Sequence, residues 1–135
     1  MIKLFAIATS ALFCTLIAPA FAADEQDVEE FEKRVGRSNA LAEKPGMMDT
    51  ALQRIATETG VPIENVRNQH KRHPETGAGG LLVANVLANE TKKAPAAFLK
   101  QHADGKKWLA IARDNKVSVE KLNERLERFQ KALTK

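Results

Sequence analysis

Apolar residues recur every three or four positions over most of the chain after residue 24, which is the spacing that aligns them on one face of an α-helix. Residues 24–43 carry Val28, Phe31 and Val35 at this spacing and predict an acidic amphipathic helix, which a turn at 44–46 ends. No segment alternates with the period of two that is typical of strands. We therefore expect an all-α protein.

Capping and breaking residues divide the remaining pattern into short helices. Asp49 and Ser118 are suited to helix N-caps, Gly60 to a helix end, and Pro62 and Pro95 to helix starts. The segment HPETGAGG, residues 73–80, is the longest run of helix-breaking residues. Within it TGAGG, residues 76–80, opens a helix but lacks the Lys-Ser/Thr ending and the preceding strand of a phosphate-binding loop, so it predicts a flexible connection.

One short sequence pattern is repeated along the chain. IATETGVPIENV, residues 55–66, returns as IARDNKVSVEKL, residues 111–122, and a shift of 32 positions aligns 56–70 with 88–102. The repeat predicts three helix-turn-helix hairpins, with turns at 60–62, 92–94 and 116–118. One hairpin cannot bury its apolar face alone, so we expect a compact bundle of about six to seven short helices. The predicted close contacts between helices are Ile55, Ala56, Ala88, Ile111 and Ala112.

The first 22 residues have the organisation of a secretory signal. Lys3 precedes an apolar run over residues 4–18, and Ala20-Phe21-Ala22 would allow cleavage before Ala23. The only cysteine, Cys14, lies in this segment, so the predicted mature chain depends on apolar packing instead of disulfides. We expect a signal peptide at 1–22, an acidic helix and linker at 23–46, a three-hairpin domain at 47–135, and a periplasmic or secreted location.

Charge is distributed unevenly along the chain. Residues 24–32 hold six acidic residues and no base, whereas 33–135 hold 20 basic and 11 acidic residues. Two lysine pairs, beside the only tryptophan, suggest a basic face that would attract an anionic polymer. The candidate contact residues are Lys92, Lys93, Lys106, Lys107 and Trp108. An exposed Trp108 would favour glycan or wall binding, and a buried one a structural role.

Three resemblances bear on function. LQRIATETGVPIENVRNQH, residues 52–70, resembles the helix-turn-helix of bacterial DNA-binding repressors, which would direct Asn65, Arg67 and Asn68 to the major groove. Residues 105–122 are similar to the helical part of LysM modules, which bind peptidoglycan and chitin-like glycans. The chain as a whole resembles small secreted bacterial proteins with degenerate helix-turn-helix repeats, a likeness that implies no particular activity.

Candidate catalytic and metal-binding groups are few. His70, His73 and His102 are the only histidines, and Lys71 and Arg72, between the first two, would repel a metal cation. The predicted mature chain has two serines and lacks a nucleophile motif such as G-x-S-x-G. We predict no metal site, no cofactor and no enzymatic activity.

The sequence favours an exported, non-catalytic interaction or structural protein. Its expected partner is an envelope or extracellular protein, and the alternative is a cell-wall glycan or another anionic envelope polymer bound through the basic face. A DNA-binding role is the second alternative, which export disfavours.

Overall fold

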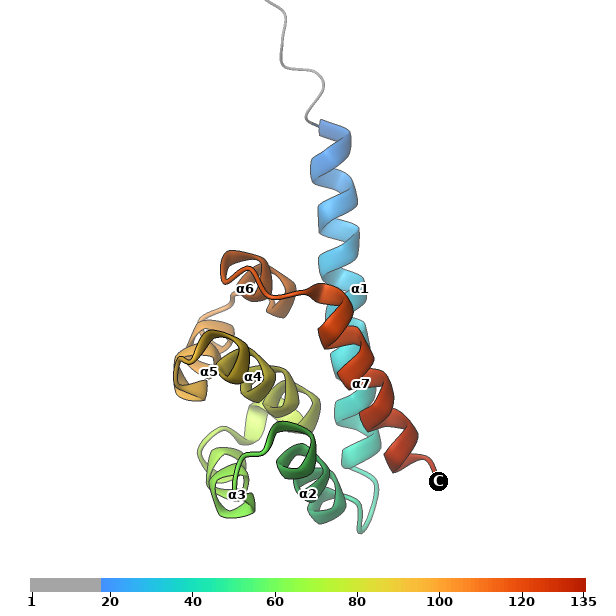
Figure 1. The fold of residues 1–135 in the computed structure, drawn as a ribbon. Helices are drawn as coiled ribbons and strands as arrows, with labels where there is room; N and C mark the ends of the chain where they lie inside the picture. The colour runs from blue at the N-terminus through green and yellow to red at the C-terminus, as the bar shows by residue number, and fades with distance from the viewer. Residues whose placement is uncertain (1–17) are drawn as a thin grey trace, which may run out of the picture.

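The structure is a computed structural model that describes the backbone of residues 18–135 and the side chains from residue 25 onward. Seven α-helices and one short 3-10 helix account for nearly all of this part, which contains no strand (Figure 1). The all-α prediction is confirmed. The helices are α1 (Ala18–Ala42), α2 (Met48–Thr59), α3 (Ile63–Arg72), η2 (Pro74–Thr76), α4 (Gly77–Thr91), α5 (Pro95–Ala103), α6 (Trp108–Asp114) and α7 (Val119–Leu133).

The helix α4 is the centre of the bundle. Every residue from Gly77 to Ala88 is buried, and α1, α2, α3, α5 and α7 all pack against it. The sequence of this buried part is apolar on nearly all sides, as expected of a core helix, and only the last turn, from Asn89, reaches solvent. The long helix α1 runs beside α4 and α7, and its N-terminal turns project beyond the other helices (Figure 1).

The three predicted hairpins are confirmed as α2–α3, α4–α5 and α6–α7. Each turn has one residue in the left-handed region at the equivalent position, namely Gly60 (φ 74°), Lys92 (φ 62°) and Lys116 (φ 58°). The residue before each of these positions donates a side-chain hydrogen bond to the carbonyl four residues earlier. These donors are Thr59, Thr91 and Asn115. The repeat in the sequence therefore encodes one turn geometry three times.

The predicted close contacts are mostly core positions. Ile55, Ile111 and Ala112 are fully buried, and Ala88 is 7% exposed. Ala56 differs, because it is only partly buried at the edge of the core. The repeat thus identified the apolar face of each hairpin, with an error of one side chain at its margin.

The prediction of a flexible connection at 76–80 was wrong. Thr76 ends η2, the next four residues form the first turn of α4, and Thr76 to Gly80 are buried. Gly77 and Gly79 lie very close to α1. A Cβ atom on Gly79 would lie 2.7 Å from the Val35 carbonyl oxygen and 2.8 Å from Ser38 Cβ. Glycine at this position allows the backbones of α1 and α4 to approach each other closely. A flexible loop would not need glycine for this reason.

We expect Gly79→Ala to lower the free energy of unfolding by about 1–3 kcal/mol, because the new methyl group must displace the backbone of α1. Gly36→Ala is the matched control, since a Cβ atom on Gly36, inside α1, would meet no neighbouring element within 4 Å. Alanine is the better helix former, so this control should raise stability by about 0.5–1 kcal/mol. Chemical denaturation measures both. Equal stabilisation by the two substitutions would contradict the close approach of α1 and α4.

The helix α1 contributes apolar side chains to the core. Phe31, Val35 and Ala42 belong to the same apolar core as α4 and α7.

The two predicted helix caps have different outcomes. Asp49 does not cap α2, because Met47 occupies the N-cap position and Asp49 lies in the first turn. Ser118 is confirmed as the cap of α7, where its Oγ accepts a hydrogen bond from the Lys121 N–H. Of the predicted signal peptide, residues 1–17 lie outside the described residues.

Candidate functional site

The four predicted contact lysines are all exposed and lie on the two turns that flank α5. We refer to Lys92, Lys93, Lys106 and Lys107 as the turn lysines. Lys92 terminates α4, and Lys107 occupies the N-cap position of α6. The helix between the two turns has nine residues, or about 14 Å of axial length.

The side chains of two turn lysines meet at the C-terminal end of α6. Lys93 Nζ donates a hydrogen bond to Asn115 Oδ1 at 2.9 Å, and Lys106 forms an ion pair with the neighbouring Asp114. Asp114 and Asn115 end α6, and the exposed Lys116 follows them directly. Cationic side chains from three turns therefore gather at one helix C-terminus, where the helix dipole favours positive charge.

Trp108 does not share this surface. Its side chain is fully buried, so the prediction that it contacts a polymer is not supported by its position. The ring stacks on His102 with a centroid separation of 4.3 Å and an interplanar angle of 11°. A Cβ atom on Gly80 would lie 3.4 Å from the indole ring, about a van der Waals contact distance, so the ring packs against this part of α4. Burial of the ring favours a structural role for Trp108.

A carboxylate from α1 holds this aromatic pair in place. Glu32 Oε2 accepts a hydrogen bond from the backbone N–H of Trp108 at 2.7 Å, and Glu32 Oε1 lies 3.3 Å from His102 Nε2. Glu32 therefore caps the N-terminus of α6 from another helix, where a negative charge is favourable. Burial alone would raise the pKa of Glu32, but the bonds with His102 and Trp108 and the nearby positive charges outweigh it and lower the pKa.

The lowered pKa of Glu32 predicts a dependence of stability on pH. A carboxylate whose pKa is lower in the folded state stabilises the fold above its unfolded pKa, which is about 4.3, and loses that contribution as the pH falls through the folded value. Glu32→Gln should therefore destabilise the protein at pH 7 by more than at pH 3. Urea unfolding at the two pH values measures the difference. A penalty that does not change with pH would contradict the role of the charged form.

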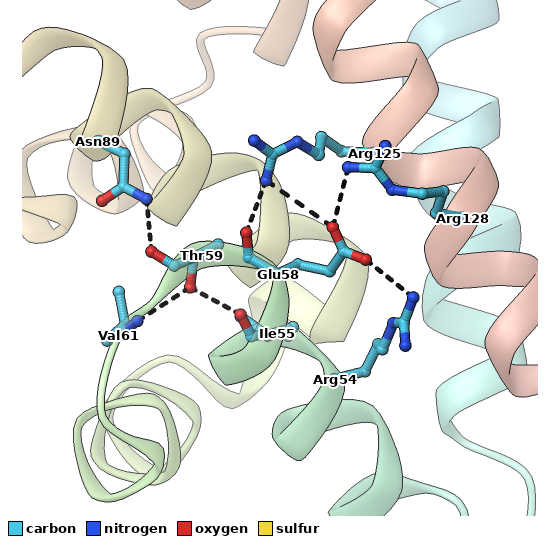
Figure 2. A network of polar contacts seen from close by, with 8 residues as sticks. All are labelled: Arg54, Ile55, Glu58, Thr59, Val61, Asn89, Arg125 and Arg128. Atoms are coloured by element: carbon cyan, nitrogen blue, oxygen red, sulfur yellow. Dashed lines mark hydrogen bonds and ion pairs between the residues drawn. The ribbon is translucent and has the colours of Figure 1, made fainter.

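A second carboxylate links α2 to α7. The Glu58 side chain is 9% exposed and forms ion pairs with Arg54 at 2.9 Å and Arg128 at 3.0 Å. Arg125 lies 3.8 Å from the same carboxylate and donates a hydrogen bond to the Glu58 carbonyl oxygen at 2.6 Å. Figure 2 shows the three guanidinium groups around Glu58. This arrangement joins the end of α2 to α7, so we assign it to the fold.

Neither carboxylate cluster was predicted, although one signal was available. Glu58 and Glu90 are equivalent in the repeat, and Lys121 binds Glu90 at 3.0 Å as Arg125 and Arg128 bind Glu58. The bases on α7 are spaced by four and three positions, which places them on one helix face. No comparable pattern connects Glu32 with Trp108, since they are 76 positions apart.

The histidines are dispersed in the structure. His102 contacts Glu32, whereas His73 ends α3 and lies 3.8 Å from Glu75. The side chain of His70 has a buried Nδ1 without a hydrogen-bond partner in the described part of the chain. Among the described residues, no group of three or more His, Cys, Asp or Glu side chains could hold a metal ion.

In α3, which resembles a DNA-recognition helix, the central arginine forms ion pairs within the protein. Arg67 forms ion pairs with Asp49 at 3.0 Å and with Glu64 at 2.8 Å. Asn65 and Asn68 are exposed beside it. An arginine held by two carboxylates presents less positive charge to a phosphate backbone, which weakens the interpretation of α3 as a DNA reader.

Comparison with models of known protein families, with curated proteins and with solved structures found no match to this chain. Within the part of the chain that the structure describes, no helix combines the length and apolar character that a membrane crossing requires.

Proposed function

We propose that this protein is an exported, non-catalytic interaction protein that binds an anionic macromolecule of the cell envelope through its turn lysines. The observation that carries the proposal is the gathering of Lys93 and Lys106 at the end of α6, with Lys116 next to them. Side chains from separate turns meet there on a rigid scaffold. Such a cluster attracts a polyanion by its summed potential.

The buried Trp108 determines what kind of recognition this surface offers. Sugar binding commonly uses an exposed aromatic face, and the only tryptophan of the chain is fully covered. The turn lysines provide ammonium groups, which act as flexible point charges without the planar geometry of a guanidinium. Binding is therefore expected to depend on charge density, with little selectivity for a particular sugar.

The internal contacts of the turn lysines limit the expected affinity. Lys106 is partly neutralised by Asp114, and Glu90 lies near the same turns. Lys107 lies near Glu32, whose pKa it helps to lower, and Lys93 bonds to an uncharged amide. Lys92, Lys93 and the adjacent Lys116 therefore contribute most of the uncompensated charge. Exposed charges are screened over about 8 Å at physiological ionic strength, so the attraction is modest.

Co-sedimentation with insoluble wall material tests the proposal. The variant with all four turn lysines replaced by glutamine should lose binding while it keeps its helical circular dichroism. The matched control replaces four exposed lysines elsewhere, Lys33, Lys44, Lys71 and Lys135, and removes the same net charge. We expect it to bind nearly as well as the original protein.

Two outcomes would contradict this function. Equal loss of binding in both variants would show that net charge alone is responsible and that the turn surface is not special. Failure to bind either wall material or an acidic envelope-protein fraction would exclude an anionic partner at this surface. Binding to the protein fraction alone would identify the partner as a protein.

A further inference from the structure

The first turns of α1 that are described with side chains form an acidic surface. Glu25, Glu29 and Glu30 are exposed, and none of them forms a hydrogen bond or an ion pair within the part of the chain that the structure describes. We refer to these three residues as the acidic turns. The surface hollow beside them is lined by four carboxylates and a single base, Lys33, and this end of α1 projects beyond the other helices (Figure 1). The acidic turns therefore face solvent with unmatched negative charge.

The direction of the acidic turns is fixed by the core. Phe31 and Val35 follow them on the same continuous helix, and each is 3% exposed. The neighbouring Asp27 is matched by Arg113 at 3.6 Å. Within the described residues, however, no ion pair joins the acidic turns to a turn lysine of the same chain. Their negative charge is thus available to another molecule.

Lys92, Lys93 and Lys116 form a surface that is complementary to this charge. Lys92 and Lys116 are exposed and have no ion pair among the described residues, and Lys93 donates to an uncharged side-chain amide. A hollow of about 330 Å³ is lined by Lys93 and Lys116. The two carboxylates at its edge, Glu90 and Asp114, are each paired with another lysine. The hollow therefore retains positive charge that an incoming carboxylate can neutralise.

We propose that the acidic turns of one copy of this protein bind Lys92, Lys93 and Lys116 of a second copy. The inference rests on the proposed function, because it names a partner for the same basic surface, and it implies that self-association and polymer binding compete. Each copy carries both surfaces, so the contact is heterologous and continues from copy to copy. Exposed ion pairs are individually weak and are screened by salt, so we expect a dissociation constant of about 0.1–1 mM at low ionic strength.

Two complementary variants test this contact by sedimentation equilibrium. The first carries Glu25→Gln, Glu29→Gln and Glu30→Gln, and the second carries Lys92→Gln, Lys93→Gln and Lys116→Gln. Each variant alone should stay monomeric at about 0.5 mM protein and low salt, where the original protein associates beyond dimers. An equimolar mixture should form a dimer and nothing larger, because only one contact between the two variants is then possible. A mixture that stays monomeric, or either variant alone associating as strongly as the original protein, would overturn the proposal.

A matched control separates this contact from an effect of net charge. Replacing three lysines by glutamine lowers the formal net charge from +4 to +1, and the weaker repulsion would by itself increase association. The control variant has the same net charge but keeps the proposed contact, since it replaces the exposed Lys44, Lys71 and Lys135. It should associate at least as strongly as the original protein. Equal association of the two +1 variants would overturn the assignment of the contact.

Wall binding distinguishes failure of this inference from failure of the proposed function. The variant that lacks the charges of the acidic turns keeps every lysine, so it should co-sediment with wall material at least as well as the original protein. Wall binding by a protein that does not self-associate would overturn this inference and leave the proposed function standing. Self-association without wall binding would contradict the proposed function alone.

Discussion

Replacing Trp108 with alanine should lower the free energy of unfolding by about 3–5 kcal/mol, one of the two largest effects expected for a single substitution in this protein. The side chain is fully buried, stacks on His102 and fills the space above Gly80. Its removal would leave a cavity where α1, α4, α5 and α6 meet. Equilibrium denaturation measures the loss.

Trp108→Phe is the informative control for this prediction. The indole Nε1 is buried and has no hydrogen-bond partner in the described part of the chain. A phenyl ring would keep the contact with His102 and lose no hydrogen bond, so this variant should retain most of the stability. A mild effect of Trp108→Ala, under about 1 kcal/mol, would mean that the ring is exposed and available to a ligand.

Ile111→Ala should destabilise the protein by about 2–5 kcal/mol. Ile111 is fully buried on α6, and it is the repeat equivalent of Ile55, which is fully buried on α2. If the two hairpins are equivalent, Ile55→Ala should have an effect of similar size. The measurement is chemical denaturation of both variants under the same conditions.

The control for this comparison is Ile63→Ala, at a partly buried position next to the core. The same atoms are removed there with less loss of contact, so the effect should be clearly smaller. A loss below about 0.5 kcal/mol for Ile111→Ala would show that α6 faces solvent and that the repeat alignment is wrong in its third copy.

The helices and their turns could be predicted from sequence because the patterns that specify them are local and are repeated along the chain. Apolar spacing defined the helices, and the recurring phrase at 55–66 and 111–122 located equivalent turns at Gly60, Lys92 and Lys116. The glycines at 77, 79 and 80 were misread because glycine disfavours an isolated helix. Gly77 and Gly79 lie against α1, a contact about 40 positions away in sequence, and Gly80 lies against Thr76 and Trp108; the contacts with α1 and Trp108 are not contained in local propensity.

The surface of the turn lysines could be predicted only because these lysines occur as adjacent pairs in the sequence. Adjacent lysines at 92–93 and 106–107 indicated a basic surface, but their approach to Asp114 and Asn115 depends on how α5 is placed between them. Trp108 was grouped with them because it is next to Lys107, whereas its side chain points into the core.

The salt dependence of binding tests the central claim most directly. A fluorescently labelled poly-L-glutamate chain should bind the protein more weakly as salt rises from about 50 to 200 mM, because bound counterions and screening compete with the turn lysines. The slope of log affinity against log salt should become shallower in the quadruple turn-lysine variant, and it should change less in the control with Lys33, Lys44, Lys71 and Lys135 replaced. An affinity that does not respond to salt, or a slope unaffected by loss of the turn lysines, would contradict charge-based binding at this surface.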